Sequence, residues 1–139
     1  MLKHITEIRV RYGDTDQMKF AYHGKYLDYF EIGRSEMMRD NGLTYKAIED
    51  AGYHMPVIET MIKFKNPAFY DEVLLIESRV EKLPQIKVHI DHTIKSKERG
   101  VIICEGYIEL AFVDPKLGKP IRAPKLFLDA IKKYYNDTK

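Results

Sequence analysis

The sequence has a single cysteine and no tryptophan among its 139 residues. Because Cys104 is alone, no internal disulfide can form, which favours a reducing compartment, and we expect Cys104 to be a buried structural thiol. No apolar run approaches the roughly 18 residues of a membrane span, and the first twenty residues are too charged for a signal peptide. These absences predict a cytoplasmic protein with no stable membrane insertion.

The net charge is also small, at +2 with histidine counted as neutral. A nucleic-acid-binding domain typically carries a basic stripe and a high pI, so this composition argues against a nucleic-acid partner. The sequence contains no Gly-x-Ser-x-Gly motif and no evident histidine partner for Cys104, which argues against a serine or cysteine nucleophile. The length and the 45% hydrophobic content are typical of one folded domain over residues 1–139.

We expect no metal and no cofactor. The one cluster that suggests a metal is His89, Asp91 and His92. On a strand, His89 and Asp91 share a face while His92 points to the other, whereas a catalytic zinc ion needs three convergent protein ligands. The face that carries Lys87, His89, Asp91 and Thr93 is therefore expected to be exposed to solvent.

Hydrophobic periodicity predicts an α+β fold in which about five antiparallel strands curl over one long helix. The helix spans about residues 23–41, and the charged residues Asp28, Glu31, Arg34 and Glu36 must fit around its apolar stripe of Tyr26, Tyr29, Phe30, Gly33 and Met37. A strand at 5–12 has Ile8, Val10 and Tyr12 on its buried face. Further strands are expected at 55–65, 73–82, 85–96 and 101–113, with a short helix at 44–51 and a C-terminal helix at 125–135.

An acidic loop precedes the long helix and holds Asp14 and Asp16. The amides at a helix N-terminus, here near Tyr22, His23 and Gly24, can hold the oxyanion of an acyl-transfer intermediate. A carboxylate nearby can attack the acyl carbon or activate a water molecule as a general base. Spacing alone does not choose between the two acids, and acids before a helix are most often caps or turn residues.

Several motifs in this region occur together in one known family. The run Val10-Arg-Tyr-Gly-Asp-Thr-Asp16-Gln-Met is followed by Tyr22-His23-Gly-Lys-Tyr26-Leu and then by Tyr29-Phe-Glu31-x-x-Arg34-x-Glu36. With weaker pieces at Pro67–Asp71 and Gly118–Pro124, this order resembles the 4-hydroxybenzoyl-CoA thioesterase family of hot-dog-fold acyl-CoA thioesterases. The resemblance implies a long helix wrapped by an antiparallel sheet, hydrolysis of an acyl-CoA substrate, and assembly into a homodimer or a homotetramer.

The resemblance also implies roles for single residues. It makes Asp16 the catalytic acid, as nucleophile or general base, and the backbone amide of His23 the group that polarises the thioester carbonyl. Asp14 then becomes a turn or partner residue. Many relatives have glycine where this chain has Lys19, and a lysine there either crowds the pocket mouth or contacts the CoA phosphates.

We expect the substrate to contact four further residues. Tyr22 and Tyr26 are candidates for the acyl pocket, although an aromatic stripe on a helix is more often core. Lys119 and Arg122, together with Lys125, are candidates for binding the CoA phosphates, with Lys63 and Lys65 as weaker ones. From the family, Met55 and Pro56 of a neighbouring subunit would close the pocket.

Two other functions remain open from the sequence. A hot-dog domain can also bind acyl thioesters without cleaving them, as a sensor or scaffold. Dehydration of a hydroxyacyl thioester is usually associated with a histidine and an acid together, and His23 is the one histidine at the proposed site. Neither the acyl group nor the choice between dimer and tetramer follows from the sequence.

Overall fold

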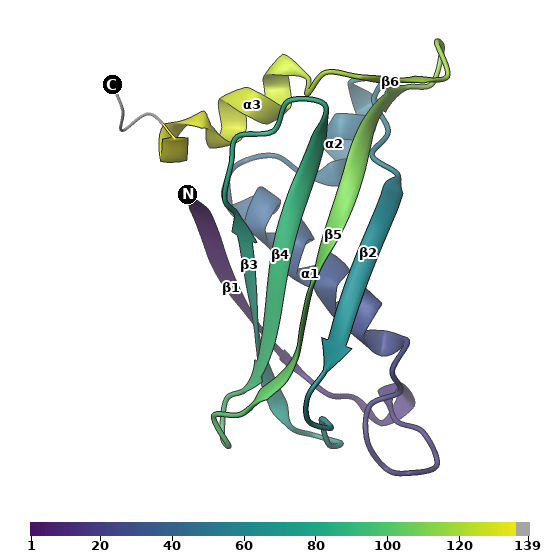
Figure 1. Ribbon diagram of the computed structural model, residues 1–139, viewed down its shortest axis with the longest axis vertical. Coiled ribbons are helices and arrows are strands. Elements are labelled where there is room, and N and C mark those ends of the chain that lie inside the picture. Colours follow the sequence, from purple (N-terminus) through teal and green to yellow (C-terminus); the bar gives the residue numbers. More distant parts are fainter. Residues whose placement is uncertain (136–139) are drawn as a thin grey trace.

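The computed structural model describes residues 1–135 of the chain. Figure 1 shows a long helix with a tall curved sheet in front of it and two smaller helices at one end of the sheet. The elements in chain order are β1 (Leu2–Arg9), α1 (Lys25–Asp40), α2 (Tyr45–Asp50), β2 (Val57–Phe64), β3 (Val73–Val80), β4 (Lys87–Ser96), β5 (Ile102–Asp114), β6 (Lys119–Ile121) and α3 (Lys125–Ile131). Short 3₁₀ helices occur at Tyr12–Asp14 and Lys132–Tyr135.

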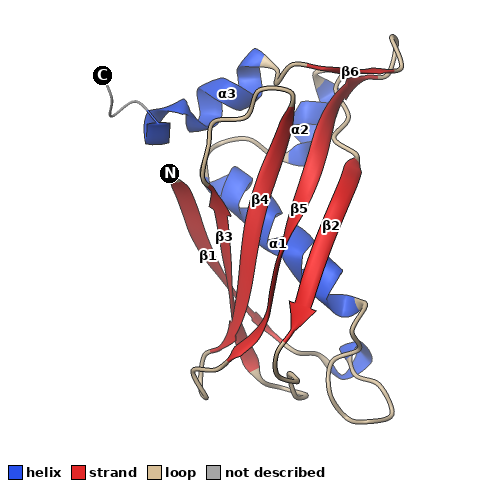
Figure 2. Ribbon diagram, viewed as in Figure 1, coloured by secondary structure: helices blue, strands red, loops and turns tan. Residues whose placement is uncertain are grey.

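All strands belong to one antiparallel sheet in the order β1-β3-β4-β5-β2, and β6 pairs with the last residues of β5. β3, β4 and β5 follow one another through short connections and lie side by side, as antiparallel strands joined by tight turns do. β2 and β1 form the two edges of the sheet (Figure 2). The predicted α+β hot-dog arrangement is therefore confirmed, with five long strands and one short one.

The apolar stripe of α1 packs against the concave face of this sheet. Tyr26, Tyr29, Phe30 and Met37 are all buried, as their spacing predicts. Gly33 lets the helix backbone approach β3 closely, because a Cβ at this position would lie 2.7 Å from both Ile76 Cγ2 and Ser78 Oγ. Gly33 thus allows α1 to pack closely against β3 within a row of large side chains.

Several expectations about single elements are wrong. β1 runs from Leu2 to Arg9, and the side chain of Tyr12 is 79% exposed because the chain turns there into a 3₁₀ helix. Arg34, expected among the charged residues around the stripe, is buried. β6 lies outside the predicted strands, because Pro115, Gly118 and Pro120 in this stretch are typical of turns. Cys104 is fully buried, as predicted, and no helix among residues 1–135 has the length and apolarity to cross a bilayer.

Candidate active site

The loop between β1 and α1 folds into a small hairpin that holds Asp16. Thr15 and Ala21 form an antiparallel bridge, and the Asp16 amide donates to the Phe20 carbonyl at 3.1 Å. The Asp16 side chain accepts one hydrogen bond, from the Met18 amide to Oδ1 at 2.9 Å. Within residues 1–135 no other hydrogen bond or ion pair uses this carboxylate. Asp16 is therefore held in place by the backbone while one of its oxygens stays available.

Lys19 closes the tip of this hairpin in a left-handed backbone conformation. Its φ is +70°, and its amide donates to the Asp16 carbonyl at 3.0 Å. Glycine adopts this conformation at no steric cost, whereas a side chain with a Cβ is strained there. Glycine, which the family resemblance implies at this position, would therefore meet the backbone requirement of the turn.

Asp14 has a different environment, although it lies two residues from Asp16. Its buried carboxylate accepts hydrogen bonds from the Tyr29 hydroxyl at 2.9 Å and the Arg11 amide at 3.0 Å, and it lies 3.5 Å from Lys25 Nζ. Burial raises the pKa of Asp14, but these donors outweigh burial and hold the pKa below its ordinary value. Asp14 is thus a turn residue that joins the loop to α1.

The residues just before α1 supply the next backbone amides near the hairpin. The Tyr22 amide donates to the Asp14 carbonyl at 2.8 Å, while no hydrogen bond within residues 1–135 uses the His23 amide. Free amides at a helix N-terminus, together with the helix dipole, form a site for a developing negative charge. The His23 amide is therefore available as an oxyanion donor.

A cavity of about 400 Å³ brings these groups together. It is lined by Asp16, Met18, Phe20, Ala21, His23, Tyr26, Phe64, Lys65, Asn66 and Pro67. Tyr26 is buried in the wall, and burial, its largest cause, raises the pKa of the Tyr26 hydroxyl to about 12. Tyr26 is therefore a neutral phenol at physiological pH. The cavity has a mainly apolar wall with Asp16 and His23 beside it, which suits an acyl group.

A second loop, residues 65–72, packs against this hairpin. The Ala21 amide donates to the Ala68 carbonyl at 2.7 Å, and Phe20 bridges Phe69. The sequence singles out Lys65 and the Pro67–Asp71 motif in this loop but does not predict its contacts with the hairpin, because these contacts join residues far apart in the chain.

An ion pair anchors that loop. Arg99 donates to both carboxylate oxygens of Glu72, at 2.7 and 2.8 Å, and to the Pro67 carbonyl at 2.8 Å. Ser96 Oγ and the Phe69 amide also donate to Glu72. Burial raises the pKa of Glu72, but the donors from Arg99, Ser96 and Phe69 outweigh it and lower the pKa overall. Nothing in the spacing of Glu72 and Arg99 along the chain predicts this pair.

Three of the predicted substrate contacts lie outside the cavity. Tyr22 is half exposed and packs against the His23 ring, with ring centroids 4.3 Å apart. Lys119 and Arg122 lie at the β6 end of β5, roughly 30 Å along the strand from the residues that pair with Phe64. Within one chain, the structure therefore brings together Asp16, His23 and Tyr26 but not Tyr22, Lys119 or Arg122. Of the basic candidates, Lys65 lines the cavity.

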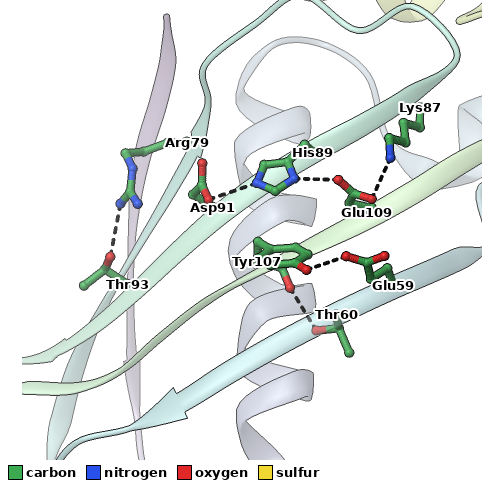
Figure 3. Close-up of polar contacts among 9 residues, drawn as sticks. All are labelled: Glu59, Thr60, Arg79, Lys87, His89, Asp91, Thr93, Tyr107 and Glu109. Atoms are coloured by element: carbon green, nitrogen blue, oxygen red, sulfur yellow. Dashed lines mark hydrogen bonds and ion pairs between the residues drawn. The ribbon is translucent and has the colours of Figure 1, made fainter.

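The outer face of the sheet carries a polar network instead of converging ligands (Figure 3). His89 bonds to Glu109 at 2.8 Å and to Asp91 at 3.1 Å, and its ring stacks on Tyr107. His92 is fully buried on the opposite face, where Nδ1 bonds to Ser78 Oγ at 3.0 Å. The two histidines thus lie on opposite sides of the sheet, as the alternation predicts.

Comparison with known proteins supports this architecture. Residues 10–131 match the model of the thioesterase-like superfamily. The chain is 32% identical to the Bacillus subtilis protein YneP over 123 residues, which cover 88% of each protein. It is 26% identical over 118 residues to the acyl-CoA thioester hydrolase YbgC of Escherichia coli O157:H7, covering 85% of this chain and 87% of that protein.

A solved structure extends the similarity. The DHNA-CoA thioesterase of Staphylococcus aureus superposes with a TM-score of 0.87 at 32% identity, covering 97% of this chain and 90% of the other. The two structures thus share their fold over nearly the whole chain.

Proposed function

The chain belongs to the thioesterase-like superfamily, and on this premise we propose that it is an acyl-CoA thioester hydrolase that releases a free acid and CoA. One observation carries the proposal: Asp16, which has an available carboxylate oxygen, and His23, whose amide forms no hydrogen bond within residues 1–135, line the same mainly apolar cavity. The named activities of YbgC and of the Staphylococcus aureus protein are of this class.

In the proposed mechanism the thioester carbonyl oxygen accepts a hydrogen bond from the His23 amide. The positive end of α1 then stabilises the negative charge that develops on this oxygen. Asp16 either attacks the carbonyl carbon, giving an acyl-aspartate anhydride that water cleaves, or removes a proton from an attacking water molecule. In both routes the carbon–sulfur bond breaks and the CoA thiolate leaves.

The acyl group would lie along the wall formed by Phe20, Tyr26 and Phe64. Tyr26 and Phe64 contact each other with ring centroids 5.6 Å apart, and Phe64 is more than half exposed. Flat aromatic walls suit an aromatic or apolar acyl group, since such groups bury their surface and can stack on the rings.

We propose that the cavity is completed by a second copy of the chain. β2 is an edge strand, and Val57, Ile58, Met61 and Phe64 along it are exposed by 37–55%. An exposed apolar edge strand is a template for pairing, and two copies related by a twofold axis pair their β2 strands antiparallel. Such pairing puts the start of one β2 strand beside the end of the other.

In that dimer the partner's Met55 and Pro56 come near Phe64 and the Asp16 loop. The β6 end of the partner's sheet approaches as well, because His54 bridges Val113, one of the residues of β5 that pair with β6. Lys119 and Arg122 would therefore serve the partner's cavity and not that of their own chain. Lys65 adds a cation from the same chain for the CoA phosphates.

The decisive experiment is a thiol-release assay on purified protein with benzoyl-CoA, butyryl-CoA and palmitoyl-CoA. We expect release by the wild type and loss of it in Asp16→Ala. Asp28→Ala is the matched control, since Asp28 is an exposed acid on α1 outside the cavity. Equal rates of thiol release in Asp16→Ala and wild type would exclude Asp16 as the catalytic acid. Tight binding of all three esters without thiol release would instead indicate an acyl-thioester-binding protein.

The proposed dimer is tested by a substitution in β2. Met61→Lys places a charge near the middle of the proposed β2–β2 contact, and light scattering after size-exclusion chromatography should then show a monomer. A wild type that is already monomeric at micromolar concentration would contradict the dimer.

We also propose that residues 1–139 act as one domain in the cytoplasm, where the lone thiol of Cys104 stays reduced.

A further inference from the structure

A second cavity lies between α1, α2 and the start of β2, and we name it the α1–α2 cavity. Its volume is about 260 Å³, and Glu31, Arg34, Tyr45, Ile48, Met55 and Leu110 are among its lining residues. It shares no lining residue with the cavity at Asp16. Its walls combine apolar side chains with one guanidinium group.

Arg34 is the unusual member of this wall. The residue is 93% buried, since its relative exposure is 7%. Its Nε and Nη1 atoms have no hydrogen-bond partner within residues 1–135. A buried charge without a partner is costly, and buried arginine is normally paired with a carboxylate or a phosphate. The arrangement therefore calls for an anion.

The surrounding residues of the chain do not supply this anion. Glu31 and Glu49 line the same cavity, but both are exposed, and neither forms an ion pair with Arg34. His92 is neutral, because burial, followed by the charges of Arg34 and Arg79, lowers its pKa to about 3. A neutral imidazole cannot balance the guanidinium charge.

Tyr45 adds a second unpaired polar group. Its hydroxyl is buried in the cavity wall and has no hydrogen-bond partner within residues 1–135. Tyr45 and Arg34 line the same cavity, and burial raises the pKa of Tyr45 while the charge of Arg34 and a polar contact with its guanidinium lower it in part. A phenol that stays protonated can donate to the same anion as the guanidinium.

We propose that the α1–α2 cavity binds the carboxylate of a small organic acid, with Arg34 and the Tyr45 hydroxyl as its donors. A guanidinium matches a carboxylate through two parallel hydrogen bonds, and Ile48, Met55 and Leu110 suit the apolar body of the acid. The two exposed glutamates disfavour a more highly charged anion such as phosphate. The volume fits a body of about the size of benzoate.

Two sources can provide this carboxylate. One is a free carboxylic acid, such as the product of thioester hydrolysis. The other is a carboxylate at the far end of the acyl group, and this source rests on the proposed function and on the β2–β2 dimer. In that dimer the start of β2, which lines the α1–α2 cavity at Val57, lies beside the end of the partner's β2, which lines the partner's Asp16 cavity.

The first arm of the test measures thermal unfolding with sodium benzoate, benzamide or sodium phosphate at constant ionic strength. We expect the Tm of the wild type to rise with the logarithm of benzoate concentration and not with benzamide or phosphate. Arg34→Met should weaken benzoate binding at least about tenfold, and Tyr45→Phe by about fivefold. Arg34→Met removes a buried unpaired charge, so this variant should fold.

The second arm compares thiol release from glutaryl-CoA and butyryl-CoA. If the carboxylate belongs to the acyl group, the ratio of kcat/KM for glutaryl-CoA to that for butyryl-CoA falls at least about tenfold in Arg34→Met. If the carboxylate belongs to a free acid, only the first arm depends on Arg34. Dependence on Arg34 in either arm supports the proposal.

The proposal is overturned if neither arm depends on Arg34, or if phosphate stabilises the protein as well as benzoate does. In the first case the guanidinium finds its partner within the assembled protein, and Arg34→Met would then shift the oligomeric state. The first arm is independent of catalysis, so it can be repeated on Asp16→Ala. If the thioesterase assay fails, the dependence of benzoate binding on Arg34 can therefore still be interpreted.

Discussion

Two arginines, one behind the Asp16 loop and one beside the α1–α2 cavity, have opposite environments. Arg99 donates to both oxygens of Glu72 and to the Pro67 carbonyl, and it ties a supporting loop to the β4–β5 turn. Arg34 is more deeply buried and has two nitrogens without partners. A charge that is fully paired holds the backbone in place, whereas an unpaired one is available to a ligand.

The same contrast separates the two acids of the loop. Asp14 has three donors, and its carboxylate joins the loop to α1. Asp16 accepts one hydrogen bond and borders a cavity. In the two arginines and in the two aspartates alike, the number of hydrogen-bond and ion-pair partners distinguishes a structural group from a candidate functional one. The following substitutions test this rule, in order of decreasing effect.

The largest effect should come from exchanging the two acids for their amides. We expect Asp16→Asn to lower kcat/KM about 10²–10⁴-fold with little change in Tm, since the carboxylate acts on the substrate in the proposed mechanism and has one hydrogen-bond partner within residues 1–135. Asp14→Asn should instead lower the free energy of unfolding by about 1–3 kcal/mol, because it weakens a hydrogen-bonded carboxylate. Thiol-release kinetics and urea unfolding measure the two effects, and the reverse pattern would contradict our assignment of Asp14 and Asp16.

Replacing Arg99 with methionine should have the next largest effect. The variant leaves the buried Glu72 carboxylate without its cation, and we expect a loss of about 2–4 kcal/mol in the free energy of unfolding at pH 7. The deficit should shrink in acid. The lowered pKa of Glu72 stabilises the wild type above the ordinary glutamate pKa, and this contribution is lost as the pH falls through the folded-state value. A pH-independent deficit would argue against the ion pair as its cause.

The same substitution at the other arginine should have the opposite sign. Without added ligand, Arg34→Met replaces an unpaired buried guanidinium by an apolar side chain of similar length. We expect a gain of about 1–2 kcal/mol in the free energy of unfolding. Arg34→Lys serves as the control that keeps the charge. A clear loss of stability in Arg34→Met would mean that this arginine is as well paired as Arg99.

The smallest effect should come from the tip of the hairpin. Lys19→Gly removes the steric strain of a left-handed backbone conformation at φ +70°. Glycine also has more backbone freedom in the unfolded chain, which offsets part of this gain in stability. We expect a net gain of up to about 1 kcal/mol in the free energy of unfolding. Lys19→Ala, which keeps the Cβ and removes the charge, separates backbone strain from the electrostatic role of the lysine. Equal stabilisation by both variants would exclude strain as the cause.

Local patterns predicted the parts of the fold whose residues follow one another in the chain. The period of α1 identified Tyr26, Phe30 and Met37 as core, and the alternation in β4 separated His89 from His92. The burial of Arg34 escaped prediction because it depends on α2 and β2, which arrive later in the sequence. The position of Lys119 far from Asp16 likewise depends on how β6 pairs with β5.

The candidate site shows the same division. A helix N-terminus after an acidic loop pointed to the region, but Asp14 differs from Asp16 through its partners Lys25 and Tyr29, which follow Asp14 by 11 and 15 residues. The resemblance to a family favours Asp16, whereas spacing alone leaves the choice between the two acids open. The strain at Lys19 shows why glycine suits that position, which the lysine side chain alone did not reveal.

The hydrogen bond from the Ala21 amide to the Ala68 carbonyl has a consequence for local opening. It couples the Asp16 hairpin to the 65–72 loop, which Arg99 in turn ties to the β4–β5 turn. In hydrogen–deuterium exchange the amides of Ala21, Phe69 and Glu72 should therefore lose their protection together, as one cooperative unit. Loosening the distant β4–β5 turn would then raise the exchange rate in the Asp16 hairpin without touching a residue of the cavity.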